Sequence, residues 1–115
     1  MSDYGLQYQT LLKVFPRKNI LVVNGELLVT NPLEEVRRVE SFLGLPPFFR
    51  DQHFVYKEKW GRFPCFKLER KLRCMGSDKG RKHPQLQEKT ISHLRRHFRP
   101  KMEAFEEETG VGFDL

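Results

Sequence analysis

The residues best suited to chemistry lie between Phe63 and Pro84, in a stretch that holds both cysteines of the chain and most of its net charge. Cys65 and Cys74 are separated by eight residues. From Lys67 to Lys82 there are seven Lys or Arg residues and two acidic ones, so five of the six net positive charges fall here. Such a concentration of cations predicts an anionic ligand for this stretch.

The basic stretch ends in a compact loop built around a glycine. Glycine lets a backbone come close to a bound anion. Lysine adds a mobile point charge, and arginine adds a planar fork that matches phosphate or sulfate oxygens. A solvated turn of the same composition is the simpler alternative. The predicted anion-binding residues are Lys79, Gly80, Arg81, Lys82 and His83.

The two cysteines have two interpretations. In a cytosolic protein, a lone pair of cysteines is more often two buried thiols than a bridge. A disulfide closing so short a loop would contribute about 2–3 kcal/mol on the chain-entropy account. It would also fix the start of the basic loop. Because the cysteines and the loop occur together, we predict that Cys65 and Cys74 form a disulfide when the protein is made in an oxidising compartment.

Composition limits the class of protein. A length of 115 residues allows one domain. The hydrophobic content of 38%, with ten Phe, is too high for a disordered chain. A net charge of +6 and a pI near 9.6 favour a polyanionic partner, such as nucleic acid, a sulfated polysaccharide or an anionic membrane. The sequence shows neither a signal peptide nor a membrane span. For a luminal protein, we expect the membrane anchor and targeting sequence to lie outside this chain.

The first part of the chain predicts a helix followed by a strand. Apolar residues at helical spacing predict a helix over Tyr4–Phe15, with Ser2 or Asp3 as the N-cap and Pro16 as the stop. Ile20–Val23 is a run of four apolar, mostly β-branched residues. This pattern is typical of a strand buried on both faces, as in a parallel sheet flanked by helices.

A second helix and a short strand are predicted in the middle of the chain. Asn31 is the expected N-cap, Pro32 takes the first helical position, and Glu34 completes a capping box. Gly44 is the expected C-terminal glycine of this helix. Phe54–Tyr56 is a candidate short strand that leads toward the cysteines.

The end of the chain predicts helix in two pieces. The first covers Gln87–Phe98, and Pro100–Thr109 continues it after a restart at the proline, with Gly110 as terminator. His93 and His97 stand four residues apart, which could seat a metal, but no third ligand is evident. We therefore predict an exposed basic helix face and no metal site.

One predicted strand cannot form a sheet alone, because its N–H and C=O groups need neighbouring strands. Those neighbours are not evident in the sequence. The chain therefore has the character of the C-terminal portion of a larger α/β domain, incomplete on its own.

The chain carries a set of motifs in a fixed order. They are Tyr4; Leu11, Leu12, Phe15 and Pro16; Ile20–Glu26 and Leu28; Asn31 and Pro32; Val39, Glu40 and Phe42–Pro46; Cys65 and Cys74; Lys79–Arg81, His83 and Pro84; and Gly112–Asp114. Taken in order, these motifs resemble the C-terminal half of the heparan sulfate glucosamine 3-O-sulfotransferases. The chain is more distantly similar to the sulfotransferase domain of the N-deacetylase/N-sulfotransferases.

The resemblance implies a fold, an activity and a location. It implies that residues 1–115 are the C-terminal portion of one P-loop-type sulfotransferase domain. The activity would be sulfuryl transfer from 3′-phosphoadenylyl sulfate (PAPS) to glucosamine units of heparan sulfate in the Golgi lumen, with a glycan rather than nucleic acid as partner. In the family the cysteine pair is a disulfide, and the loop at residues 79–83 contacts the donor. The candidate acceptor-binding residues are Tyr4, Lys71 and Arg73.

The same resemblance places the phosphosulfate loop, the catalytic glutamate and the residues that bind the 3′-phosphate before Tyr4. No Gly-x-x-x-x-Gly-Lys-Ser/Thr loop occurs in the 115 residues. We therefore predict no catalytic residue in this chain and no transfer by the chain alone. The alternatives are an N-sulfotransferase-type domain, a non-catalytic polyanion-binding module, or an inactive truncated product.

Overall fold

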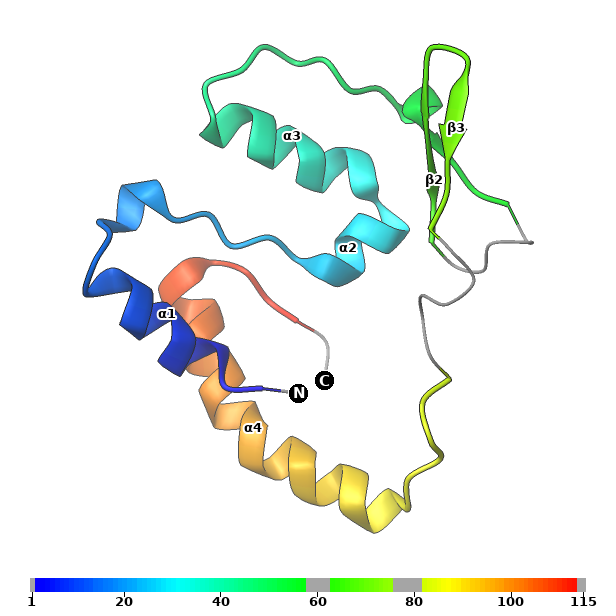
Figure 1. Cartoon of the computed structure of the whole chain (residues 1–115). Coiled ribbons are helices and arrows are strands. Elements are labelled where there is room, and N and C mark those ends of the chain that lie inside the picture. Colours follow the sequence, from blue (N-terminus) through cyan, green and yellow to red (C-terminus); the bar gives the residue numbers. More distant parts are fainter. Residues whose placement is uncertain (1, 58–62, 76–81, 114–115) are drawn as a thin grey trace. The chain divides into compact units, whose positions relative to one another are not determined.

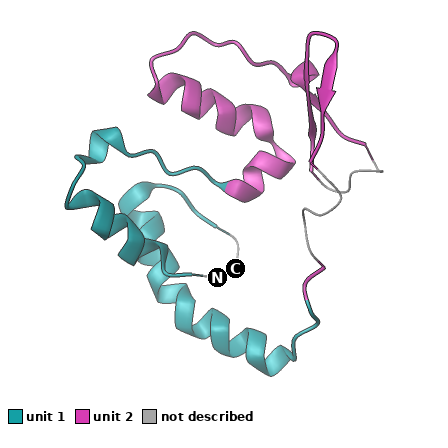
Figure 2. Ribbon diagram, viewed as in Figure 1, with its two compact units in different colours: residues 1–24, 84–115 teal, residues 25–83 magenta. Residues whose placement is uncertain are grey.

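The computed structural model describes residues 2–57, 63–75 and 82–113. The chain divides into two compact units (Figure 2). Unit 1 joins the two ends of the chain, residues 1–24 and 84–115, and unit 2 is residues 25–83. The described residues combine four α-helices with a small three-stranded sheet, so the α/β content agrees with the prediction (Figure 1).

Unit 1 begins with helix α1, Tyr4–Leu12. Asp3 is the N-cap, and its Oδ1 accepts a hydrogen bond from the Leu6 N–H at 3.1 Å, as its predicted role requires. The helix ends earlier than the predicted Phe15. Pro16 disfavours helical backbone in the residue before it, so the helix gives way to turns before the proline is reached.

Helix α4, Glu88–Thr109, forms the long element of unit 1. It runs through Pro100 without interruption, so the predicted restart at the proline is wrong. An interior proline removes one backbone hydrogen bond and strains the turn, at a cost of about 3 kcal/mol. Burial of Met102 and Phe105 on the following turns offsets that cost. Gly110 ends the helix as predicted, with φ 73° and its N–H donating to the Glu106 carbonyl at 2.7 Å.

An aromatic core holds α1 against α4. Phe105 is 4% exposed, and its ring centroid lies 5.9 Å from those of both Tyr4 and Tyr8. Phe113, beyond the end of α4, stacks on the same ring at 6.1 Å. The first and last helices of the chain are therefore joined by one cluster of rings. No helix in the described part of the chain is long and apolar enough to cross a bilayer.

The prediction of a strand at Ile20–Val23 is wrong for the described chain. These residues are half-buried and belong to no strand. Strand structure requires a ladder to a neighbour, and all strands of the described residues lie in unit 2. The segment ends at Asn24, which is 8% exposed and whose Nδ2 donates to the Gly112 carbonyl at 2.9 Å.

Unit 2 begins with two helices, α2 at Gly25–Thr30 and α3 at Pro32–Phe42. The predicted start of α3 is confirmed, but its capping box is not formed. The Asn31 side chain makes no capping hydrogen bond and instead donates to Glu34 Oε2 at 2.6 Å. Gly44, at φ 70°, ends the helix as predicted.

Glu40 of α3 forms hydrogen bonds with the segment that follows this helix. It is only 4% exposed, and its carboxylate accepts from the N–H groups of Phe48 and Phe49. Arg37 donates to its other oxygen at 3.2 Å. The hydrogen bond from Phe48, followed by that from Phe49 and the Arg37 charge, lowers the pKa of Glu40, with burial opposing.

The sheet formed by the described residues is antiparallel, and the parallel sheet expected of the larger domain stays a prediction. Its strands are β1 at Phe54–Val55, β2 at Cys65–Leu68 and β3 at Lys71–Arg73, in the order β1-β2-β3. Only Glu69 and Arg70 separate β2 from β3. Two residues suffice for an antiparallel hairpin, whereas a parallel pair needs a long crossover.

Candidate anion-binding site

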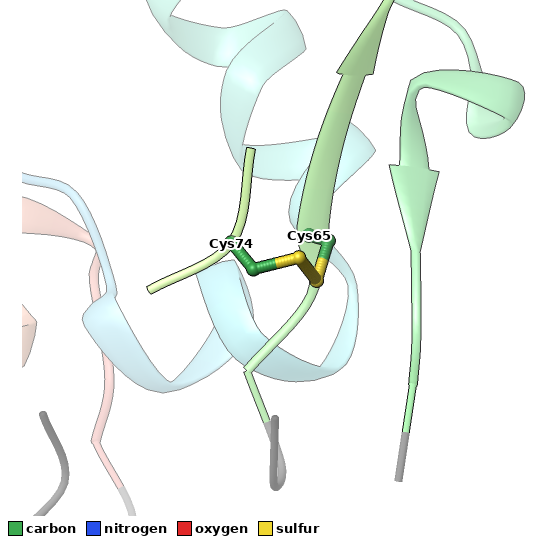
Figure 3. Close-up of a disulfide and its surroundings, with 2 residues drawn as sticks. All are labelled: Cys65 and Cys74. Atoms are coloured by element: carbon green, nitrogen blue, oxygen red, sulfur yellow. A yellow bond between two sulfur atoms is a disulfide. The ribbon is translucent and has the colours of Figure 1, made fainter. Parts of the chain in front are cut away.

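The predicted disulfide is confirmed. Cys65 opens β2 and Cys74 directly follows β3, so the bond closes the open end of the hairpin (Figure 3). Their Cα atoms are 4.3 Å apart, and Cys65 is 1% exposed. The covalent link and the β2–β3 ladder together fix which faces the basic side chains of the hairpin occupy.

Two of the candidate acceptor-binding residues share one face of this hairpin. Lys71 and Arg73 alternate along β3, so they project to the same side. Lys71 pairs with Leu68 and Arg73 with Phe66, which places these residues of β2 on that face too. Both cations are exposed. Because β3 is an edge strand, this arrangement presents two charges and an apolar surface to an approaching anionic chain.

A small polar recess lies beside strand β2 of the same sheet. It measures about 340 Å³ and is lined by Gln52, His53, Lys67 and Glu69. The Nδ1 atom of His53 accepts from the Arg50 N–H at 2.9 Å. The recess is therefore lined by a lysine and an imidazole beside one carboxylate.

The predicted donor loop falls mainly outside the described residues. Lys79, Gly80 and Arg81 are not among them, so the geometry of that loop stays a prediction. Lys82 and His83 are described, and both are exposed in an irregular segment of unit 2. Their exposure leaves both side chains accessible to a ligand.

Tyr4, the third candidate acceptor-binding residue, belongs to unit 1. Its ring centroid lies 5.4 Å from Phe113 and 5.9 Å from Phe105. Tyr4 is half-buried, so its ring has a clear packing role in the core. A contact of Tyr4 with a glycan stays a prediction.

The sequence analysis did not single out a group of arginines on α4. A recess of about 450 Å³ is lined by Ser92, Arg95, Arg96, Arg99, Pro100 and Glu103. Their spacing of three and four residues puts them on neighbouring positions of one helix. That spacing was visible in the sequence, but the recess depends on the shape of the folded helix.

The two histidines of α4 are exposed, as predicted for a basic helix face. Among the described residues, no three His, Cys, Asp or Glu side chains gather in a way that could hold a metal ion.

These features define a disulfide-closed hairpin that presents exposed basic side chains. A comparison with protein families identifies the class of protein. Residues 1–106 match the family model described as the sulfotransferase domain. The chain therefore belongs to the sulfotransferase domain family.

The curated relatives agree with the resemblance found in the sequence. The chain is 38% identical over 113 residues to mouse heparan sulfate glucosamine 3-O-sulfotransferase 6, covering 96% of the chain and 33% of that relative. Identity to mouse heparan sulfate glucosamine 3-O-sulfotransferase 3B1 is also 38%, covering 96% of the chain and 29% of that relative. The human heparan sulfate glucosamine 3-O-sulfotransferase 6 is 39% identical over 115 residues, covering 95% of the chain and 33% of that relative. The chain thus spans about a third of the length of these relatives.

Proposed function

We propose that this chain forms part of an enzyme that transfers a sulfuryl group from PAPS to the 3-hydroxyl of glucosamine units in heparan sulfate. The observation that carries the proposal is the similarity of 38–39% across nearly the whole chain to proteins named for that reaction. The disulfide supports a location in an oxidising compartment, and we assign the Golgi lumen. In this proposal, residues 1–115 belong to one P-loop-type sulfotransferase domain.

The residues of the chain divide into a donor set and an acceptor set. The donor set binds the phosphates of PAPS and consists of Lys79, Gly80, Arg81, Lys82 and His83. The acceptor set contacts the anionic glycan and consists of Tyr4, Lys71 and Arg73. The exposed cations on one face of a rigid hairpin support the second assignment.

The chain contributes cations to the reaction rather than a base. In-line transfer requires a general base to take the proton of the sugar hydroxyl. It also requires positive charge around the leaving phosphate, where negative charge develops. Lys79 and Arg81 meet the second need in this proposal. The base and the loop that binds the 5′-phosphosulfate are supplied from outside residues 1–115, so the chain alone is expected to show no transfer.

The donor assignment is tested by substituting the basic loop in the full-length protein. Lys79→Ala and Arg81→Ala should each weaken binding of adenosine 3′,5′-bisphosphate by roughly 1.5–3 kcal/mol, the range for a hydrogen bond to a charged group. Gly80→Val should have a comparable effect at unchanged charge, because a branched side chain prevents close approach of the backbone. Isothermal titration calorimetry measures all three.

The matched controls are the cations of β3. Lys71→Ala and Arg73→Ala should alter heparan sulfate binding and its salt dependence more than nucleotide affinity. A solvated basic surface predicts small, similar effects for every cation and none for the glycine. If all five variants bound the nucleotide as tightly as the parent protein does, the donor assignment would be refuted.

A polyanion-binding module without catalysis is the second candidate. It is favoured by one observation, the net charge of +6 with exposed cations such as Lys71 and Arg73. Such a module would bind heparin without nucleotide, and the full-length protein would show no transfer of radiolabelled sulfate. Nucleotide-dependent transfer to the 2-amino group instead of the 3-hydroxyl would indicate an N-sulfotransferase.

A further inference from the structure

The recess on α4 gathers three arginines on a helix that the proposed donor and acceptor sets do not use. We call the group formed by Ser92, Arg95, Arg96, Arg99, Pro100 and Glu103 the α4 arginine recess. At about 450 Å³ it has the size of a site for a small ligand or for one substituted sugar unit. Its side chains carry three positive charges and one negative charge.

One donor of the Arg95 guanidinium is unsatisfied within the described part of the chain. Its Nε atom is buried and has no hydrogen-bond partner among the described residues. Arg95 lies two turns before the buried Met102 and on the same side of the helix, which explains why this guanidinium is partly withdrawn from water. A buried donor on a charged group carries a desolvation penalty until an acceptor binds it.

Three arginines of the described chain have carboxylate partners, whereas Arg50, Arg70 and Arg73 form no ion pair among the described residues. Arg17 contacts Glu108 at 3.2 Å, Arg37 contacts Glu40 at 3.2 Å, and Arg38 contacts Glu35 at 2.8 Å. In contrast, Arg95, Arg96 and Arg99 form no ion pair within the part of the chain that the structure describes.

The chemistry of the lining fits an oxyanion. Guanidinium forks match the oxygens of sulfate and carboxylate groups, and the Ser92 hydroxyl adds another donor. Pro100 adds an apolar wall against which the carbon face of a sugar can rest. Glu103 repels a second anionic group, so the recess accepts one oxyanion rather than a dense cluster.

We propose that the α4 arginine recess binds one sulfate or carboxylate group of the heparan sulfate chain, as a contact additional to the β3 cations. This inference rests on the proposed function for its ligand. It assigns to α4 a role in holding the acceptor chain, and no role in the chemical step.

The test measures binding of a heparin octasaccharide to the full-length protein by calorimetry at low salt. Arg96→Ala and Arg99→Ala, both at exposed positions, should each weaken binding roughly tenfold, the usual size of one charge-assisted contact. Arg95→Lys keeps the charge but removes the planar guanidinium fork that matches an oxyanion, and it should weaken binding to a similar degree. The control is Lys89→Ala, which removes one charge from an exposed position on the same helix outside the recess and should change affinity less than twofold.

The outcomes of this test separate specific binding by the recess from diffuse charge attraction and from a structural role of the arginines. Equal small losses for Lys89→Ala and the arginine variants would mean that only diffuse charge acts, and the inference would be wrong. The inference would also be wrong if an arginine variant bound the octasaccharide as tightly as the parent but had a lower thermal midpoint. That result would mean that the arginine binds a carboxylate of the protein and not the glycan. Far-ultraviolet circular dichroism shows whether each variant keeps its helix content. Sulfuryl transfer by the parent protein is assayed separately. If the parent shows no transfer, the proposed reaction is wrong, but arginine-dependent binding of the octasaccharide would still support the recess.

Discussion

Removal of the Cys65–Cys74 bond should free the hairpin formed by β2 and β3. The two cysteines are nine positions apart, so the bond closes a short loop. The chain-entropy relation for a loop of this length gives about 2.6 kcal/mol of stabilisation, all of it lost on reduction. At 1.4 kcal/mol for each factor of ten, the open form of the hairpin should become about 70-fold more populated.

Limited proteolysis with trypsin measures this opening. Lys67 lies within β2, so cleavage after it requires the strand to leave the sheet. When opening and closing are fast relative to cleavage, the cleavage rate follows the population of the open form. Cleavage after Lys67 should therefore rise by up to about 70-fold on reduction. Cleavage after Arg96, within α4 of unit 1, should not change and serves as the internal control.

A Cys74→Ala variant separates the bond from the reductant. Without reductant, it should show the same increase at Lys67 as the reduced parent. Equal cleavage rates in the oxidised parent, the reduced parent and the variant would refute the reasoning. The hairpin would then be held by its backbone ladder and by ring contacts such as that between Phe54 and Phe66.

Three further predictions concern the packing of each unit. Because the Phe48 N–H lowers the pKa of Glu40 from its ordinary value of 4.5, this carboxylate stabilises unit 2 fully above about pH 4.5 and loses its effect as the pH falls through the lower folded-state pKa. In urea titrations, the free energy of unfolding of Glu40→Gln should therefore fall less steeply on the acid side than that of the parent. Phe105→Ala should lower the free energy of unfolding by about 3–5 kcal/mol, whereas Phe15→Ala, at a position 49% exposed, should have a much smaller effect in the same urea titration. Gly110→Ala should lower the thermal midpoint by an amount equivalent to about 1–2 kcal/mol, because φ is 73° there, and an unchanged midpoint would mean that the helix end relaxes.

Local features of the fold could be predicted from the sequence. The Asp3 cap, the proline at the start of α3, and the glycines at residues 44 and 110 each depend on a few adjacent residues. The disulfide was predictable because the short cysteine spacing coincided with a basic loop and matched a family resemblance.

Features that depend on distant residues could not be predicted. The run at Ile20–Val23 has strand composition, but a strand exists only where a neighbour completes its ladder. The helix through Pro100 persists because Phe105 meets rings from α1 and from the end of the chain. Of the candidate site, the shared face of Lys71 and Arg73 follows from strand alternation. The buried Nε of Arg95 could not be inferred without the folded helix.

The composition of unit 1 from both ends of the chain has a consequence for biosynthesis. Helix α1 leaves the ribosome before unit 2, but Met102, Phe105 and Phe113 of its partner segment emerge after unit 2. The whole of unit 2 is translated in between, so α1 must wait for a distant contact while its apolar residues stay accessible to chaperones. A stop codon anywhere before α4 would permanently deprive α1 of its partner. It would leave untouched the local contacts that unit 2 had already formed.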